Sequence, residues 1–121
     1  MIAIIDDDQG VRSALCNLLD SAGYHSCGFA SAEDFLAGET ALQPTCALVD
    51  VELAQMSGFT LLEQLATREP RFPVIMMSAH GTNAYRIRAQ QLGALELLVK
   101  PVHADTLLAC IARARAAAGP G

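Results

Sequence analysis

The sequence contains no tryptophan, few other aromatic residues and no cluster of basic residues. Aromatic side chains make up 5% of its 121 residues, and eight lysines and arginines are scattered among thirteen acidic residues, which gives a net charge of -5. A surface that binds nucleic acid directly concentrates positive charge. We therefore expect no direct contact between this chain and nucleic acid.

Long apolar runs and paired cysteines are also missing. No apolar stretch approaches the length of a membrane span, and Met1–Ile5 runs into three aspartates without a basic leader. The cysteines form no C-x-x-C pair and lie in apolar stretches, at Cys16, Cys27, Cys46 and Cys110. We interpret them as reduced core residues. These absences predict a cytoplasmic protein that does not contact a membrane.

The sequence does have a regular alternation of short apolar runs and amphipathic segments. The runs predict five strands, at Ile2–Ile5, Tyr24–Phe29, Cys46–Val49, Pro73–Met77 and Leu95–Val99. Apolar residues three and four apart predict a helix after each strand. The second helix is expected to be short and to begin near Ser31, and the fourth to cover Asn83–Leu92.

This pattern predicts one domain of the α/β class. Continuous apolar strands are typical of a parallel sheet that is covered on both faces. We expect a single doubly wound, five-stranded parallel sheet in the flavodoxin-like order 2-1-3-4-5. The domain is expected to cover residues 1–116. Residues 117–121 consist of alanine, glycine and proline and predict the start of a linker or a terminal tail.

Polar residues follow four of the five predicted strands. Asp6 and Asp7 follow the first strand, and Asp50 follows the third. Ser78 follows the fourth strand and Lys100 the fifth. In doubly wound sheets the ligand site forms at the carboxyl ends of the strands, where the winding direction switches. The sequence therefore predicts that these side chains converge at one edge of the sheet.

Three converging carboxylates indicate a metal site, because like charges repel one another unless a cation lies between them. Oxygen ligands without a histidine or cysteine cluster fit a hard cation, and this small carboxylate set fits Mg²⁺ better than Ca²⁺. An ionised aspartate beside Mg²⁺ can attack phosphorus. Lys100 would neutralise the transferring oxygens, and Ser78 would donate a hydrogen bond to one of them.

In this order and spacing, the motifs resemble those of the receiver domains of two-component response regulators, which are CheY-like proteins. They are an acidic pair, an aspartate followed eight residues later by glycine, a serine before alanine and a lysine before proline, at Asp6, Asp7, Asp50, Gly58, Ser78, Ala79, Lys100 and Pro101. The resemblance extends from Ile2 to about Arg115. Segment 31–36 is also similar to receivers of the nitrogen-fixation type.

The resemblance implies a phosphorelay protein. Asp50 would accept a phosphoryl group from a phosphohistidine of a sensor histidine kinase. The Mg²⁺ ligands would be Asp6, Asp7, Asp50 and the backbone carbonyl of Glu52. Lys100 and Ser78 would read the phosphorylated state. Such a domain is not a classical enzyme, although it catalyses its own phosphorylation and dephosphorylation.

The resemblance also implies how the signal is used. Nitrogen-fixation-type regulators usually carry a C-terminal helix-turn-helix domain that binds DNA and regulates transcription, and we expect that domain to be absent from this chain. Phosphorylation would change the face formed by the fourth helix, the fifth strand and the fifth helix. Partners would read this face, which could also form a homodimer.

The chain departs from the family pattern at its switch position. Leu97 stands where the family usually has a tyrosine or phenylalanine that turns inward on phosphorylation. Glu52 and His80 occupy positions that adjust the lifetime of the acyl phosphate in the family. The bond between Lys100 and Pro101 is usually cis in the family, which predicts a cis bond here.

Each candidate residue also has a simpler interpretation. Asp8 precedes a predicted helix and fits an N-cap. Asp50, Ser78 and Lys100 could each be an ordinary residue at the end of a strand, although their joint occurrence argues against this. His25 and His103 fit surface residues.

Three other classes of function remain open. Three departures from the family pattern, Ala54, Leu97 and Val102, fit an interaction module that has the receiver fold but works without phosphorylation. Asp50 and Glu52 faintly resemble the D-x-D motif of haloacid-dehalogenase phosphatases, with glutamate in place of the second aspartate. Ser78 and His80 suggest a hydrolase triad, but Ser78 lies outside a G-x-S-x-G motif.

Overall fold

The computed structural model describes residues 1–68 and 71–117, in which strands and helices alternate five times. The elements are β1 (Ile2–Ile5), α1 (Gln9–Ser21), β2 (Ser26–Phe29), α2 (Ala32–Leu42), β3 (Cys46–Asp50), α3 (Gly58–Leu65), β4 (Val74–Ser78), α4 (Asn83–Gln91), β5 (Glu96–Val99) and α5 (Ala104–Ala117). This alternation confirms the predicted α/β class. The predicted linker, residues 117–121, lies outside the described residues apart from the last residue of α5.

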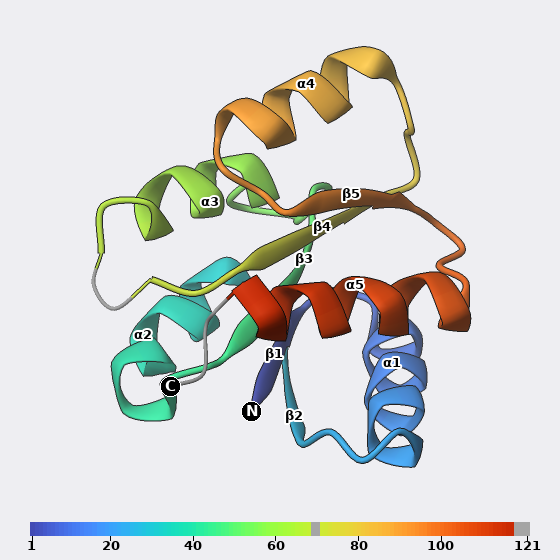
Figure 1. Ribbon diagram of the computed structural model, residues 1–121. Coiled ribbons are helices and arrows are strands. Elements are labelled where there is room, and N and C mark those ends of the chain that lie inside the picture. Colours follow the sequence, from blue (N-terminus) through green and yellow to red (C-terminus); the bar gives the residue numbers. More distant parts are fainter. Residues whose placement is uncertain (69–70, 118–121) are drawn as a thin grey trace.

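The strands form one parallel sheet in the order β2-β1-β3-β4-β5, as predicted. In the register of the central strands, Ile5 pairs with Val49 and Asp50 pairs with Met77. The chain therefore winds in one direction from β1 to β2 and in the other from β3 to β5 (Figure 1). The carboxyl ends of β1 and β3 lie side by side at this switch in direction.

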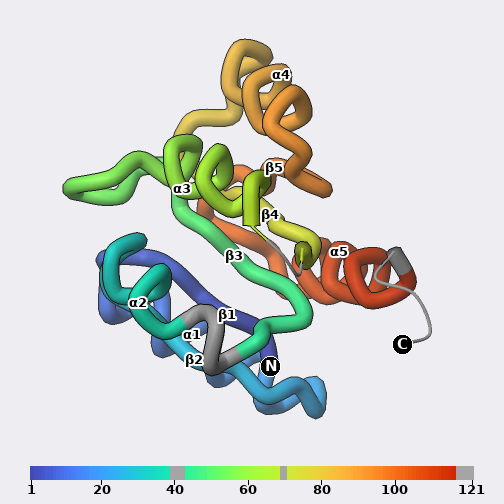
Figure 2. Tube along the Cα trace, turned by 90° about the vertical axis from the view of Figure 1, so that its left-hand side faces the viewer, coloured from blue at the N-terminus to red at the C-terminus, as the bar shows by residue number. Residues whose placement is uncertain are grey.

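Two apolar layers cover the two faces of the sheet. Along β1, Ala3 and Ile5 face one layer, which is completed by α2, α3 and α4. Ile2 and Ile4 face the other layer, which is completed by α1 and α5. Figures 1 and 2 show α3 and α4 on the opposite side of the sheet from α5. Both faces of the central strands are buried, which explains their continuous apolar sequence.

Helix α1 is held at both ends by local contacts. The side chain of Asp8 accepts a hydrogen bond from the backbone of Val11 at 3.1 Å, which confirms Asp8 as an N-cap. At the other end Gly23 has a φ of 87°, a left-handed conformation that glycine adopts without strain. The backbone of Tyr24 donates to the Leu19 carbonyl at 2.9 Å in the same turn.

Several predicted bounds differ from the structure by one or two residues, and one helix differs in length. Strand β2 begins at Ser26 instead of Tyr24, because the Tyr24 backbone belongs to the C-terminal turn of α1. The prediction that the second helix is short is wrong. Helix α2 has 11 residues against 8 in α3. Ser31 Oγ accepts from the Asp34 backbone at 3.0 Å at its start, and Phe35 is fully buried.

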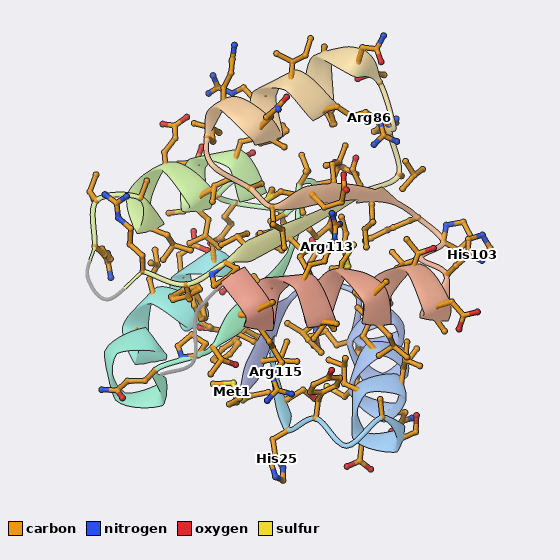
Figure 3. All side chains as sticks on the ribbon, viewed as in Figure 1. Met1, His25, Arg86, His103, Arg113 and Arg115 are labelled. Atoms are coloured by element: carbon orange, nitrogen blue, oxygen red, sulfur yellow. The ribbon has the colours of Figure 1, made fainter. Side chains whose placement is uncertain are left out.

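The cysteines and histidines lie partly where the sequence predicts. All four cysteines are free, but only Cys46 and Cys110 are buried, whereas Cys16 and Cys27 are half-buried. Cys27 lies on the edge strand β2, which has a neighbour on one side only. His25 and His103 are exposed, as predicted, and point away from the sheet (Figure 3).

Within the described ranges, no helix has the length and apolar character needed to cross a membrane.

We expect Cys46 to resist thiol reagents in the folded protein. Burial raises the pKa of its thiol to about 11, so the reactive thiolate is on the order of 0.1% of the total at pH 8. A disulfide reagent should modify Cys16 and Cys27 first, and Cys46 only after denaturant is added. Peptide mass spectrometry of timed samples measures this order. Modification of native Cys46 as fast as Cys16 would contradict it.

Candidate functional site

Three carboxylates converge at the carboxyl ends of β1 and β3. Asp6 follows β1 and is fully buried, Asp50 ends β3 and is 3% exposed, and Asp7 is exposed. One carboxylate oxygen from each residue lies within 4.8 Å of the others. The predicted convergence of these acids is therefore present in the structure. It follows from the pairing of β1 with β3, which places the ends of the two strands side by side.

Lys100 reaches this cluster from the end of β5. Its Nζ atom lies 2.8 Å from Asp6 Oδ2 and 3.1 Å from Asp50 Oδ2. The side chain of Lys100 is 22% exposed, so these pairs are largely shielded from water. The peptide bond between Lys100 and Pro101 is cis, as the resemblance implies. One ammonium group thus bridges the two buried carboxylates.

Backbone N–H groups fix the orientation of both buried carboxylates. The backbone of Asp8 donates to Asp6 Oδ1 at 2.9 Å, and the backbone of Glu52 donates to Asp50 Oδ1 at 3.1 Å. The backbone carbonyl of Asp6 is held as well, because the Arg12 guanidinium donates to it at 2.7 Å. Each carboxylate therefore offers one oxygen to the backbone and the other to Lys100.

The start of α3 approaches the backbone of the Asp50 segment closely. A Cβ atom on Gly58 would lie 2.2 Å from the Asp50 carbonyl oxygen and 2.9 Å from the Val51 Cα atom. No real Cβ fits there, so glycine is required at this position by contact and not by its dihedral angles. This explains the glycine eight residues after Asp50. It keeps the loop after β3 tight against the site.

The pKa values of Asp50 and Lys100 are both raised. Burial raises the pKa of Asp50, and the negative charge of Asp6 raises it further, whereas Lys100 and the Glu52 backbone lower it by less. Burial by itself lowers the pKa of Lys100, but its contacts with Asp6 and Asp50 outweigh burial and the net shift is upward. Lys100 therefore stays charged near neutral pH. A single ammonium group does not fully compensate two buried carboxylates.

Ser78 lies at the end of β4 and is fully buried, but its partner differs from the expected ones. Its Oγ donates to the Glu52 carboxylate, with distances of 2.8 Å to Oε2 and 3.1 Å to Oε1. The backbone of Ala79 donates to Glu52 Oε1 at 3.0 Å. The backbone of His80 donates to Ser78 Oγ at 2.9 Å. The Glu52 side chain thus links the end of β4 to the loop after β3.

Sequence reasoning missed this role of the Glu52 side chain. It assigned to Glu52 only a backbone carbonyl and an effect on the acyl-phosphate lifetime. The one signal in the sequence is a glutamate two residues after the strand-end aspartate. Its partner lies 26 residues away, on another strand. Only the pairing of β3 with β4 brings the two side chains together.

The remaining candidates lie beside the cluster. Leu97 is 3% exposed and belongs to the apolar layer on the α4 side. The exposed His80 packs its ring edge-on against Tyr85, with centroids 6.1 Å apart. Ser78 Oγ receives a bond from the His80 backbone and donates to Glu52, so the structure gives no hydrolase triad at these residues.

The acidic cluster fits a hard divalent cation. Its three ligand atoms are all carboxylate oxygens from Asp6, Asp7 and Asp50, the donor type that such cations prefer. Burial, and after it the negative charge of Asp6, raises the pKa of Asp50, and a cation at the cluster would relieve the repulsion between these two carboxylates. The exposure of Asp7 leaves one side of the cluster open to water. The residues present therefore suit a cation that keeps water ligands.

Comparison with known proteins identifies the family. Residues 2–112 match the response regulator receiver domain family. This chain is a receiver domain. It is 36% identical over 119 residues to the transcriptional regulatory protein FixJ of Bradyrhizobium diazoefficiens, covering 98% of this chain and 58% of FixJ. It is also 36% identical over 111 residues to the DNA-binding transcriptional regulator NtrC of Klebsiella pneumoniae, covering 92% of this chain and 24% of NtrC.

A solved structure agrees with the fold of this receiver domain. A CheY-like receiver domain protein of Methanospirillum hungatei superposes with a TM-score of 0.89 at 27% identity, covering 97% of this chain and 94% of that one. The predicted CheY-like fold and the resemblance to nitrogen-type regulators are both confirmed. The receiver domain spans only part of the length of FixJ and NtrC.

We expect Asp50→Asn to stabilise the metal-free receiver domain at pH 7, because it removes a buried negative charge that burial and Asp6 disfavour. As the pH rises from acid, Asp50 ionises first in the unfolded chain, and the wild type loses stability until the folded carboxyl group has also ionised. The advantage of the variant should therefore disappear as the pH falls below the ordinary range for aspartate.

Urea unfolding with a metal chelator at several pH values measures this difference. Asp105→Asn, which removes an exposed charge from the first turn of α5, is the matched control and should give no gain. A less stable Asp50→Asn at pH 7 would mean that the pair with Lys100 outweighs the repulsion.

Proposed function

We propose that this receiver domain accepts a phosphoryl group on Asp50 from a phosphohistidine of a sensor histidine kinase. A carboxylate oxygen of Asp50 forms the new bond to phosphorus. The bond from phosphorus to the imidazole nitrogen breaks, and its electron pair stays on that nitrogen. The domain thereby catalyses its own phosphorylation, and later the hydrolysis of the acyl phosphate, without being a classical enzyme.

The observation that carries this proposal is the position of Lys100 between the two buried carboxylates. Lys100 Nζ lies 3.1 Å from Asp50 Oδ2, so it stands beside any group that is transferred to Asp50. A fixed ammonium charge at this point stabilises the negative oxygens of the transferring phosphoryl group. The contact with Asp6 holds Lys100 in place before a donor arrives.

The acidic cluster supports Mg²⁺ as the cofactor. Asp6, Asp7 and Asp50 would hold it with the backbone carbonyl of Glu52, and Asp7 is the accessible member through which water would reach the site. Bound Mg²⁺ would neutralise charge on the phosphoryl oxygens. The tight loop fixed by Gly58 keeps the Glu52 backbone beside Asp50.

The surface that partners read is proposed to be the face of α4, β5 and α5. Ile87 on α4 and Val99 on β5 are the large apolar side chains with the highest exposure among the described residues, 54% and 39%. Arg113 of α5 pairs with Glu96 of β5 at 3.2 Å, and Figure 3 shows Arg113 between α5 and β5. This mixture of apolar and charged groups suits a regulated contact, such as a homodimer.

The wider assignment rests on the named relatives. FixJ and NtrC are described as transcriptional regulators, and this chain covers 58% and 24% of them. We extend this to the present chain as a receiver domain over residues 1–116, followed by a linker and a DNA-binding output domain outside this sequence. A phosphorelay from a histidine kinase would operate in the cytoplasm. Glu52 and His80, both exposed near Asp50 and Ser78, would adjust the lifetime of the phosphorylated form.

A second candidate function is favoured by one observation. Leu97 is already buried in the α4 layer, so no aromatic side chain at this position can move inward on phosphorylation. The receiver domain could then bind its partner in the same way with and without phosphate. Phosphorylation of Asp50 without any change in partner affinity or oligomeric state would support this alternative.

We expect a small phosphodonor such as acetyl phosphate to add one phosphoryl group to the wild type in the presence of Mg²⁺. Asp50→Asn should add none, and a chelator should lower the yield by at least about tenfold, because the charge on the transferring oxygens is then uncompensated. Intact-protein mass spectrometry measures the adduct. The control Asp20→Asn, an exposed aspartate of α1, should behave as the wild type. An adduct on Asp50→Asn would refute the acceptor assignment.

A further inference from the structure

The carboxylate of Glu52 occupies the hydrogen-bond donors at the end of β4. Ser78 Oγ donates to it at 2.8 Å and the backbone of Ala79 at 3.0 Å. Its own backbone N–H donates to Asp50 Oδ1 at 3.1 Å. One residue therefore contacts the phosphoryl acceptor with its backbone and the end of β4 with its side chain.

Ser78 is the hydrogen-bond donor that the sequence predicts for a phosphoryl group on Asp50. This inference rests on the proposed function: a phosphoryl group on Asp50 would accept a hydrogen bond from Ser78, as the sequence predicts. The neighbouring Ala79 N–H already binds the same carboxylate as Ser78. The Ser78 hydroxyl has one proton to donate. A phosphoryl oxygen and the Glu52 carboxylate therefore compete for it, and both are negatively charged.

We propose that the Glu52 side chain is an internal competitor that holds Ser78 and Ala79 in the resting state and must be displaced when Asp50 is phosphorylated. The contact keeps the buried Ser78 hydroxyl satisfied while the site is empty of phosphate. Displacement costs little desolvation, because the Glu52 residue is exposed and its carboxylate can return to water. Glu52 acts here as a positioning residue.

The contact also bears on how the signal leaves the site. Ser78 Oγ accepts from the backbone of His80, whose ring packs against Tyr85 on α4. The Tyr85 ring in turn meets Phe59 of α3, with centroids 5.3 Å apart. Release of Ser78 and Ala79 from Glu52 therefore frees the segment that leads to α4. This route to α4 does not pass through position 97, where this chain has leucine in place of the family's aromatic residue.

The test measures how tightly beryllofluoride, a stable analogue of the phosphoryl group, binds with Mg²⁺. Glu52→Ala should bind it roughly tenfold more tightly than the wild type, because a competing charged hydrogen bond is gone. Glu52→Gln should fall between the two, since its neutral amide still accepts but less strongly. The backbone carbonyl of Glu52 is unchanged in both variants. The Ala79 amide signal in NMR titrations reports the binding.

Two controls separate the contact from the charge. Glu63→Ala removes an equal charge from an exposed glutamate that pairs with Arg88, and should leave beryllofluoride affinity unchanged. Glu52→Asp keeps the charge but is one methylene shorter, so it should lose its hold on Ser78 and bind beryllofluoride more tightly than the wild type. Glu52→Asp also replaces Glu52→Ala as the test variant if Glu52→Ala fails to fold. An affinity of Glu52→Asp equal to the wild type would overturn the proposal.

A measurement without metal or phosphate analogue tests the contact by itself. Hydrogen exchange of the Ala79 amide should be roughly tenfold faster in Glu52→Ala than in the wild type, because its acceptor is removed. Equal exchange rates would overturn the proposal even if beryllofluoride binds normally. Failure of the wild type to bind beryllofluoride, with slow Ala79 exchange retained, would instead refute the proposed function and leave the resting contact in place.

Discussion

The contact between Lys100 and the two buried carboxylates is the interaction on which the site depends. Asp6 and Asp50 lie at neighbouring strand ends and repel each other, and the pKa of Asp50 is raised first by burial and then by the charge of Asp6. Lys100 reaches both acids from the end of β5. The three charged groups therefore meet only when β1, β3 and β5 have the correct positions in the sheet. The fold therefore assembles a cluster that is partly compensated and open to one more cation. Under the proposed function, this partial compensation suits the cluster to chemistry on phosphorus.

Much of this arrangement could be predicted from the sequence. Short apolar runs and helical spacing are local signals, and they predict the five alternating units. The strand order is predicted from the usual order of flavodoxin-like doubly wound sheets. Parallel topology then decides where each strand ends, so the positions of Asp6, Asp50 and Lys100 at one edge follow from chain order alone. Asp8 was recognisable as a cap for the same reason, since its partner Val11 is three residues away.

The rest depends on contacts between distant residues. The side chain of Glu52 has no local partner, and its bond to Ser78 exists only because β3 and β4 pair in one register. Strand β2 begins later than predicted because the Tyr24 backbone N–H is hydrogen-bonded to Leu19 in the turn after α1. The half-buried state of Cys27 reflects its place on an edge strand, which an apolar sequence does not reveal.

In the resting state, the Glu52 side chain holds the end of β4, and Leu97 is already buried. We infer that a signal from Asp50 would reach α4 through His80 and Tyr85. The central claim is that Asp50 is the residue that accepts the phosphoryl group. The most direct test reduces the phosphorylated protein with borohydride, which converts an aspartyl phosphate to homoserine, and locates the product by peptide mass spectrometry. The account predicts homoserine at position 50 alone. Its appearance in place of Asp6 or Asp7, with Asp50 unchanged, would contradict the account.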